Sequence, residues 1–195
     1  MFRFQPLNQH RKNSIDFLFA KAKELHQLGV DGERNAVKEA FALLERIRRF
    51  NPNHPLVNAY YGSTIALLGR DAIDMQERTE KAEAGLKILD HAVSCDPDNV
   101  EIRILRGYVS YRLPNMYFRR TKTATEDFEY LVSRFEQDPD IFPDEFYCQI
   151  LYDLGTSYRA LHQEQNAEDT WKKLLERTSD PKYRDLISKK TNTSN

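Results

Sequence analysis

The residues most often used in catalysis lie apart from one another in this sequence. The five histidines are His10, His26, His54, His91 and His162. No two of them stand at the spacing of metal ligands, and no H-E-x-x-H motif is present. The sequence also lacks a G-x-S-x-G nucleophile motif and a glycine-rich phosphate loop. We therefore predict that the chain is not an enzyme, uses no cofactor and holds no metal ion.

One acidic stretch has side chains that could hold a cation. Its members are Asp138, Asp140, Asp144 and Glu145. Pro139 and Pro143 interrupt the stretch, and the spacing differs from that of an EF-hand loop. These features favour a solvated linker between two helices.

An aromatic and basic segment at residues 117–122 is a candidate binding element. It contains Tyr117, Phe118, Arg119, Arg120 and Lys122. Two neighbouring rings and three cations could bind an acidic protein segment, a nucleic acid or an anionic membrane. In the alternative interpretation, the two rings fill a space between helices and the cations stay solvated. The sequence leaves both interpretations open.

Overall composition limits the classes of partner. The 195 residues include 29 basic and 30 acidic side chains, with a net charge of −1. A general nucleic-acid or membrane binder is usually strongly basic, so the balance favours a protein partner. No stretch approaches about 18 consecutive apolar residues, and Cys95 and Cys148 form no C-x-x-C motif. We expect a cytoplasmic protein whose two cysteines are reduced and half-buried. We predict no small-molecule substrate.

Helical periodicity is clearest in residues 149–175, where two apolar stripes flank a short polar turn. The order Leu154-Gly155, Tyr158, Ala167 and Trp171 resembles the tetratricopeptide repeat, which places L-G, Y, A and F at these spacings. More loosely, the chain is similar to small bacterial tetratricopeptide proteins, a resemblance that transfers no activity. Its basis is Arg106-Gly107, Leu113-Pro114 and Phe118-Arg119.

Looser copies of this unit recur along the chain. Pro52 and Gly62 are ten residues apart, and so are Pro97 and Gly107. In the copy that contains Gly62, an insert of about eleven residues precedes Gly85. We expect this insert to extend the second helix of that hairpin at its start.

These patterns predict an all-α fold, a tetratricopeptide-like α-α superhelix of about four antiparallel helix hairpins and a C-terminal capping helix. We expect a single helical repeat domain at 14–190, whose first helix begins after Asn13 or Ser14. The expected hairpins are 14–50, 55–96, 99–136 and 144–178, with a capping helix at 181–190. Residues 1–13 would form a leader in which Met1, Phe2 and Phe4 cap the first helices, and residues 191–195 a disordered tail.

The resemblance implies a protein-interaction adaptor whose concave groove binds a peptide or helix of a partner. Transferring the family's helical phase places six partner-binding residues on the groove. These are Tyr108, Tyr111, Arg112, Tyr152, Thr156 and Arg159. The same phase points to Ala59 and Ser63 in the hairpin at 55–96. Packing against the next helix is the alternative role for Tyr108 and Tyr152, and self-association through a solenoid end stays open.

Overall fold

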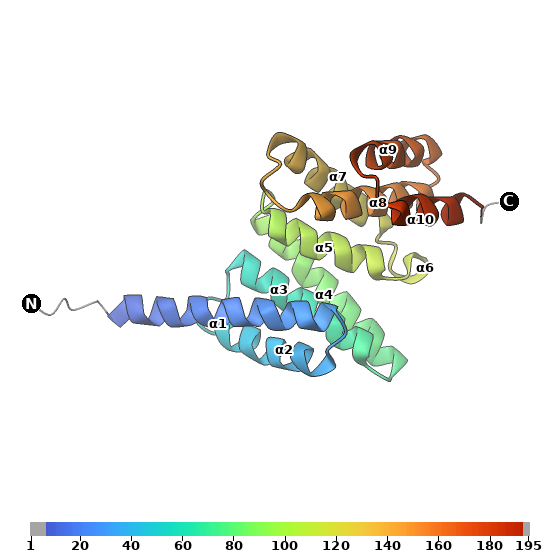
Figure 1. Cartoon of the computed structure of the whole chain (residues 1–195). Coiled ribbons are helices and arrows are strands. Elements are labelled where there is room, and N and C mark those ends of the chain that lie inside the picture. The colour runs from blue at the N-terminus through green and yellow to red at the C-terminus, as the bar shows by residue number, and fades with distance from the viewer. Residues whose placement is uncertain (1–6, 193–195) are drawn as a thin grey trace, which may run out of the picture. The chain divides into compact units, whose positions relative to one another are not determined.

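The computed structural model describes residues 7–192, with side chains for 14–190. These residues form ten helices and no strand (Figure 1). The helices are α1 (Leu7–Val30), α2 (Arg34–Arg48), α3 (Pro55–Asp71), α4 (Met75–Cys95), α5 (Val100–Arg112), α6 (Asn115–Phe118), α7 (Thr121–Gln137), α8 (Asp144–Ala160), α9 (Glu164–Arg177) and α10 (Pro181–Asn192). The prediction of an all-α fold is confirmed.

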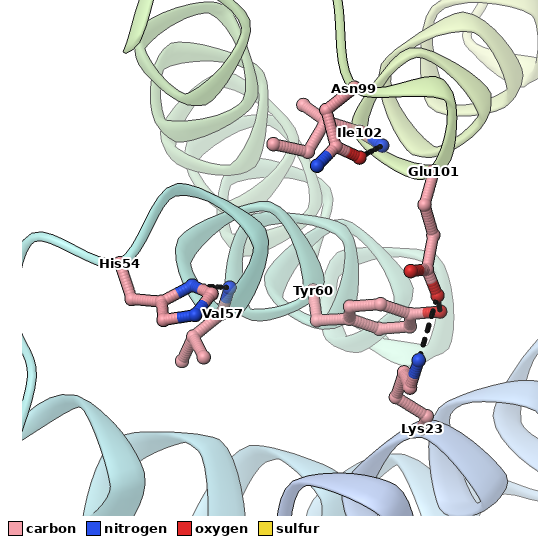
Figure 2. Close-up of polar contacts among 7 residues, drawn as sticks. All are labelled: Lys23, His54, Val57, Tyr60, Asn99, Glu101 and Ile102. Carbon is pink, nitrogen blue, oxygen red and sulfur yellow. Dashed lines mark hydrogen bonds and ion pairs between the residues drawn. The ribbon is translucent and has the colours of Figure 1, made fainter. Parts of the chain in front are cut away.

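Side-chain caps fix the starts of three helices. The His54 ring accepts the Val57 amide at 3.4 Å, Asp74 accepts that of Glu77 at 2.8 Å, and Asn99 accepts that of Ile102 at 3.2 Å. His54 and Asn99 are 45 positions apart, the same offset that separates Pro52 from Pro97. The internal repeat therefore includes the capping position, as the two caps in Figure 2 show.

Two boundaries differ from the sequence-based expectation. Helix α1 begins at Leu7, ahead of the expected start after Asn13 or Ser14. The insert lengthens both helices of its hairpin, because α3 continues to Asp71 and α4 begins at Met75. Asp74 caps α4 in the middle of a run of helix formers, and this cap divides the insert.

In two of the helix pairs, close contact depends on glycine. A Cβ atom on Gly85 would lie 2.5 Å from the Gly62 carbonyl oxygen, so α3 and α4 approach at backbone distance. A Cβ on Gly155 would lie 2.3 Å from Nε1 of Trp171, so the α9 indole occupies the notch that this glycine leaves in α8. The same indole nitrogen donates to the Tyr152 carbonyl at 3.2 Å.

The chain divides into two compact units, Met1–Arg106 and Gly107–Asn195, and the division falls within α5. The first unit buries Val37, Ala40, Leu44, Ile47, Leu89 and Ile102. The second unit buries Phe135, Tyr147, Cys148, Leu151, Tyr152, Leu174 and Tyr183 in one cluster. The single domain at 14–190 stays a prediction. The expected cap of Met1, Phe2 and Phe4 lies outside the described residues, as do residues 193–195 of the expected tail.

Candidate functional site

A buried carboxylate organises the polar surface of the second unit. Asp153 on α8 is only 4% exposed, and its Oδ2 accepts the Tyr108 hydroxyl at 3.3 Å and the Gln149 amide at 3.0 Å. The Tyr111 hydroxyl also hydrogen-bonds this carboxylate. Burial raises the pKa of Asp153, while the hydrogen bonds from Gln149, Tyr111 and Tyr108 and the charge of Arg112 oppose the rise. Two segments far apart in the sequence, the end of α5 and the middle of α8, are thereby joined.

The two α5 tyrosines are fixed by aromatic contacts beneath them. The ring of Tyr108 lies 5.2 Å from that of Phe128 and 5.9 Å from that of Phe146, between ring centres. Tyr111 meets the same Phe128 ring edge-on at 5.6 Å. Burial raises the pKa of both tyrosines, and the neighbouring Asp153 carboxylate adds to the rise. Both hydroxyls therefore keep their protons and donate to Asp153.

Arg112 supplies the exposed cation of this surface. Its guanidinium lies 5.9 Å from the centre of the Tyr108 ring, and the residue is exposed. Tyr108, Tyr111, Gln149 and Thr156 around it are half-buried. We call these six residues, with Asp153 as their buried centre, the Asp153 surface: Tyr108, Tyr111, Arg112, Gln149, Asp153 and Thr156. It presents aromatic rings, amide and hydroxyl groups and one positive charge, which suits binding.

Of the six residues expected on the groove, the structure gathers Tyr108, Tyr111, Arg112 and Thr156. Thr156 hydrogen-bonds Tyr111 and donates to the Tyr152 carbonyl at 3.0 Å. Tyr152 is 8% exposed, and its ring lies 6.1 Å from that of Tyr183 within the core. Arg159 lies near the α8–α9 turn, with its Nε 3.8 Å from the Glu164 carboxylate. Partner contacts by these residues stay a prediction.

The family's helical phase also points to Gln149, but it does not point to Asp153. An aspartate on an amphipathic helix is usually solvated, so nothing in its type marks Asp153 as buried. The signal available was position, since Gln149, Asp153 and Thr156 follow one another at spacings of four and three along one face of a helix.

The aromatic and basic segment is divided between the surface and the interior. Tyr117 is 74% exposed and the preceding Met116 is 77% exposed, whereas Phe118 is half-buried. Arg119 adopts a left-handed backbone conformation with φ of 53° and is exposed. Arg120 is half-buried, and its Nε donates to the Ser110 hydroxyl at 3.4 Å. Only Phe118 fits the interpretation that both rings fill a space between helices.

A second polar cluster lies in the first unit and joins three helices. Glu101 Oε1 accepts the Tyr60 hydroxyl at 2.5 Å and the Lys23 ammonium at 3.1 Å (Figure 2). Beside it, Nε2 of the buried His26 ring lies 2.8 Å from the Ser63 hydroxyl oxygen. Burial lowers the pKa of His26 to about 4, so this imidazole is neutral at pH 7.

This cluster corrects the expected phase of α3. Ala59 is fully buried and Ser63 is 4% exposed. The family pattern suggested that both face an open groove, but Ser63 lies against His26 of α1. That expectation is wrong, because α1 packs on α3 and covers this face.

In the described part of the chain, no three His, Cys, Asp or Glu side chains gather closely enough to hold a metal ion. None of the described helices combines the length and apolarity needed to cross a membrane.

Solved structures with similar folds belong to tetratricopeptide-repeat proteins. A double mutant of MamA RS-1 has a TM-score of 0.55 and 20% identity, over 84% of this chain and 79% of that one. YrrB, described as a tetratricopeptide-repeat protein with an unusual peptide-binding site, has a TM-score of 0.53 and 18% identity, over 93% and 84%. MamA from Desulfovibrio magneticus RS-1 has a TM-score of 0.51 and 14% identity, over 87% of each chain.

The chain has the tetratricopeptide-repeat fold. No protein-family model matches the sequence, and no curated protein matches it significantly. The structural likeness therefore identifies an architecture and no partner.

The tetratricopeptide-repeat fold also explains the residues within 149–175 that match the repeat pattern. Leu154, Ala167 and Trp171 are buried, as expected for core positions. Tyr158 is half-buried, and its hydroxyl donates to Glu129 of α7 at 2.5 Å. The residues that carry the resemblance are therefore structural, and the Asp153 surface is built from the positions between them.

Proposed function

We propose that this protein is a non-catalytic interaction scaffold, acting in the cytoplasm, that binds a peptide or helix of a partner protein on the Asp153 surface. The observation that carries the proposal is the fixed placement of Tyr108 and Tyr111 by the buried Asp153 carboxylate. Ordering long side chains on binding costs free energy, and rings that are already ordered avoid much of that cost. Tyr and Arg are also the side chains enriched at interface hot spots.

The chemistry of the surface indicates what the partner presents. Arg112 offers an exposed guanidinium, which pairs with a carboxylate or a backbone carbonyl. The half-buried rings of Tyr108 and Tyr111 offer apolar area with polar edges. A partner segment with an apolar or aromatic side chain next to an acidic one complements this arrangement. YrrB, the fold neighbour described as having an unusual peptide-binding site, supports a proposal of the same class of function.

Quantitative partner capture from the source cells tests the proposal. Wild-type protein, Arg112→Glu and Tyr111→Ala serve as baits, with Lys172→Glu as the control. Lys172 is exposed on α9 and carries the same charge as Arg112. The proposal expects proteins that the wild type and the control retain equally and that both site variants lose by at least about tenfold, or about 1.4 kcal/mol. Equal recovery on all four baits contradicts it.

A second candidate function rests on the exposure of Met116 and Tyr117. Two apolar side chains that are more than two-thirds exposed, close to exposed Arg119 and Lys122, have the chemistry of an anionic-membrane contact. Vesicle sedimentation at low salt with phosphatidylserine-containing and neutral vesicles tests it. Met116→Ser with Tyr117→Ser should abolish binding to the anionic vesicles. Absence of vesicle binding by the wild type, or binding only to single-stranded DNA, rejects the membrane function.

A further inference from the structure

Two metal-ligating side chains meet on the exposed face of α4. His91 and Cys95 are one helical turn apart, at spacing i, i+4, so both side chains lie on the same side of the helix. Cys95 Sγ is 3.5 Å from His91 Nε2, and both residues are exposed. Neither belongs to the Asp153 surface, and Cys95 is free. The sequence expectation of a half-buried Cys95 is wrong.

The separation of the two atoms fits one tetrahedral ion. Zn–S bonds of about 2.3 Å and Zn–N bonds of about 2.05 Å, set at the tetrahedral angle, place sulfur and nitrogen about 3.6 Å apart. The observed 3.5 Å agrees with that value, so a metal ion can replace the hydrogen between the two atoms with little movement of either side chain. The backbone of a regular helix holds the spacing rigid.

The surroundings favour a cation at this place. Cys95 is the last residue of α4, and the C-terminal turn of a helix carries partial negative charge. Asp96 follows as the C-terminal cap. A thiolate and an imidazole together prefer zinc and other borderline or soft ions over magnesium or calcium.

We propose that His91 and Cys95 form an open, two-ligand site for a zinc-class divalent ion. On binding, the Cys95 thiol loses its proton to solvent, the sulfur and Nε2 of His91 each donate an electron pair to the ion, and water completes the coordination. Two open positions make this an exchangeable site. The site mixes two residue types, so neither the histidine spacing nor the cysteine spacing in the sequence reveals it.

Cobalt titration tests the site, because Co²⁺ bound to a thiolate gives a near-ultraviolet charge-transfer band that a cobalt ion bound elsewhere lacks. The full chain, reduced with a phosphine, is titrated with Co²⁺ and then with Zn²⁺. The proposal expects one cobalt ion per chain with this band, which Zn²⁺ removes. Cys95→Ser should abolish the band, and His91→Gln should weaken cobalt affinity at least about tenfold.

His162→Asn is the matched control, since His162 is exposed on the α8–α9 turn and asparagine tolerates its positive φ of 60°. Its cobalt affinity should equal that of the wild type. Circular dichroism establishes that each variant keeps its helices. No thiolate band in the wild type at millimolar Co²⁺, a band that survives in Cys95→Ser, or unchanged affinity in His91→Gln overturns the proposal.

Discussion

At the scale of single residues, one buried carboxylate and the donors around it hold the side chains of the proposed binding surface in place. The helical phase of the family predicted positions 108, 111 and 112, because surface positions on a helix follow from its period. It could not predict Asp153, whose burial depends on which helix packs against α8. A buried carboxylate is tolerated only where donors satisfy it, and Tyr108, Tyr111 and Gln149 do so.

We expect Asp153→Ala to lower the free energy of unfolding by about 2–3 kcal/mol, because it leaves several hydroxyl and amide donors around it unsatisfied. Tyr108→Phe removes a single donor and should cost about 1 kcal/mol. Urea denaturation followed by circular dichroism measures both. Costs of equal size for the two variants would contradict the role of Asp153 as the shared acceptor.

The buried His26 makes a pH-dependent contribution to stability. Its pKa is about 4 in the folded chain and about 6.5 when unfolded, so between these values the unfolded state binds more protons. Stability should therefore fall as the pH is lowered from about 6.5 to 4, by about 3 kcal/mol at most.

Denaturation at several pH values, compared between wild type and His26→Gln, isolates this contribution. The comparison cancels opposing groups such as Asp153, whose raised pKa stabilises the folded state toward low pH. The wild type should lose more stability than His26→Gln over this range. Parallel pH profiles for the two proteins would show that His26 is not held neutral.

At the scale of helices, most of the architecture could be predicted, and the point at which the insert divides between two helices could not. Proline, glycine and apolar spacing marked the hairpins, and the Asn99 and His54 caps follow the same repeat. The division of the insert between α3 and α4 was missed because its residues are good helix formers with no breaker. The boundary lies at Asp74 because its side chain accepts the Glu77 amide. Other polar side chains in the insert could cap a helix in the same way, so the sequence does not single out this position.

The contact between α8 and α9 predicts the effect of adding one methyl group. Gly155→Ala should destabilise the protein by about 1–3 kcal/mol, because its Cβ would overlap the Trp171 indole at 2.3–2.8 Å. In a Trp171→Leu background, the same substitution should cost at least about 0.5 kcal/mol less. A double-mutant cycle in urea measures the coupling, and purely additive costs would contradict the contact.

At the scale of the whole molecule, the fold and the function were predictable to different degrees. Stacked hairpins follow from periodic apolar stripes that no single hairpin can bury, and these stripes are visible in the sequence. A repeat scaffold does not encode its partner in the residues that build it. The positions available for binding are therefore those between the structural ones, and in the second unit these form the Asp153 surface.

Site-specific photo-crosslinking tests the central claim most directly. A benzophenone amino acid replaces Glu145 in one protein and Lys172 in another, and both are irradiated in the source cells. Glu145 is exposed on α8, one turn before Gln149, and is not a member of the Asp153 surface. The proposed function predicts a discrete crosslinked partner protein from position 145 that Arg112→Glu in the same chain removes, and none from position 172. Crosslinks of equal yield to the same proteins from both positions, or none from position 145, would contradict it.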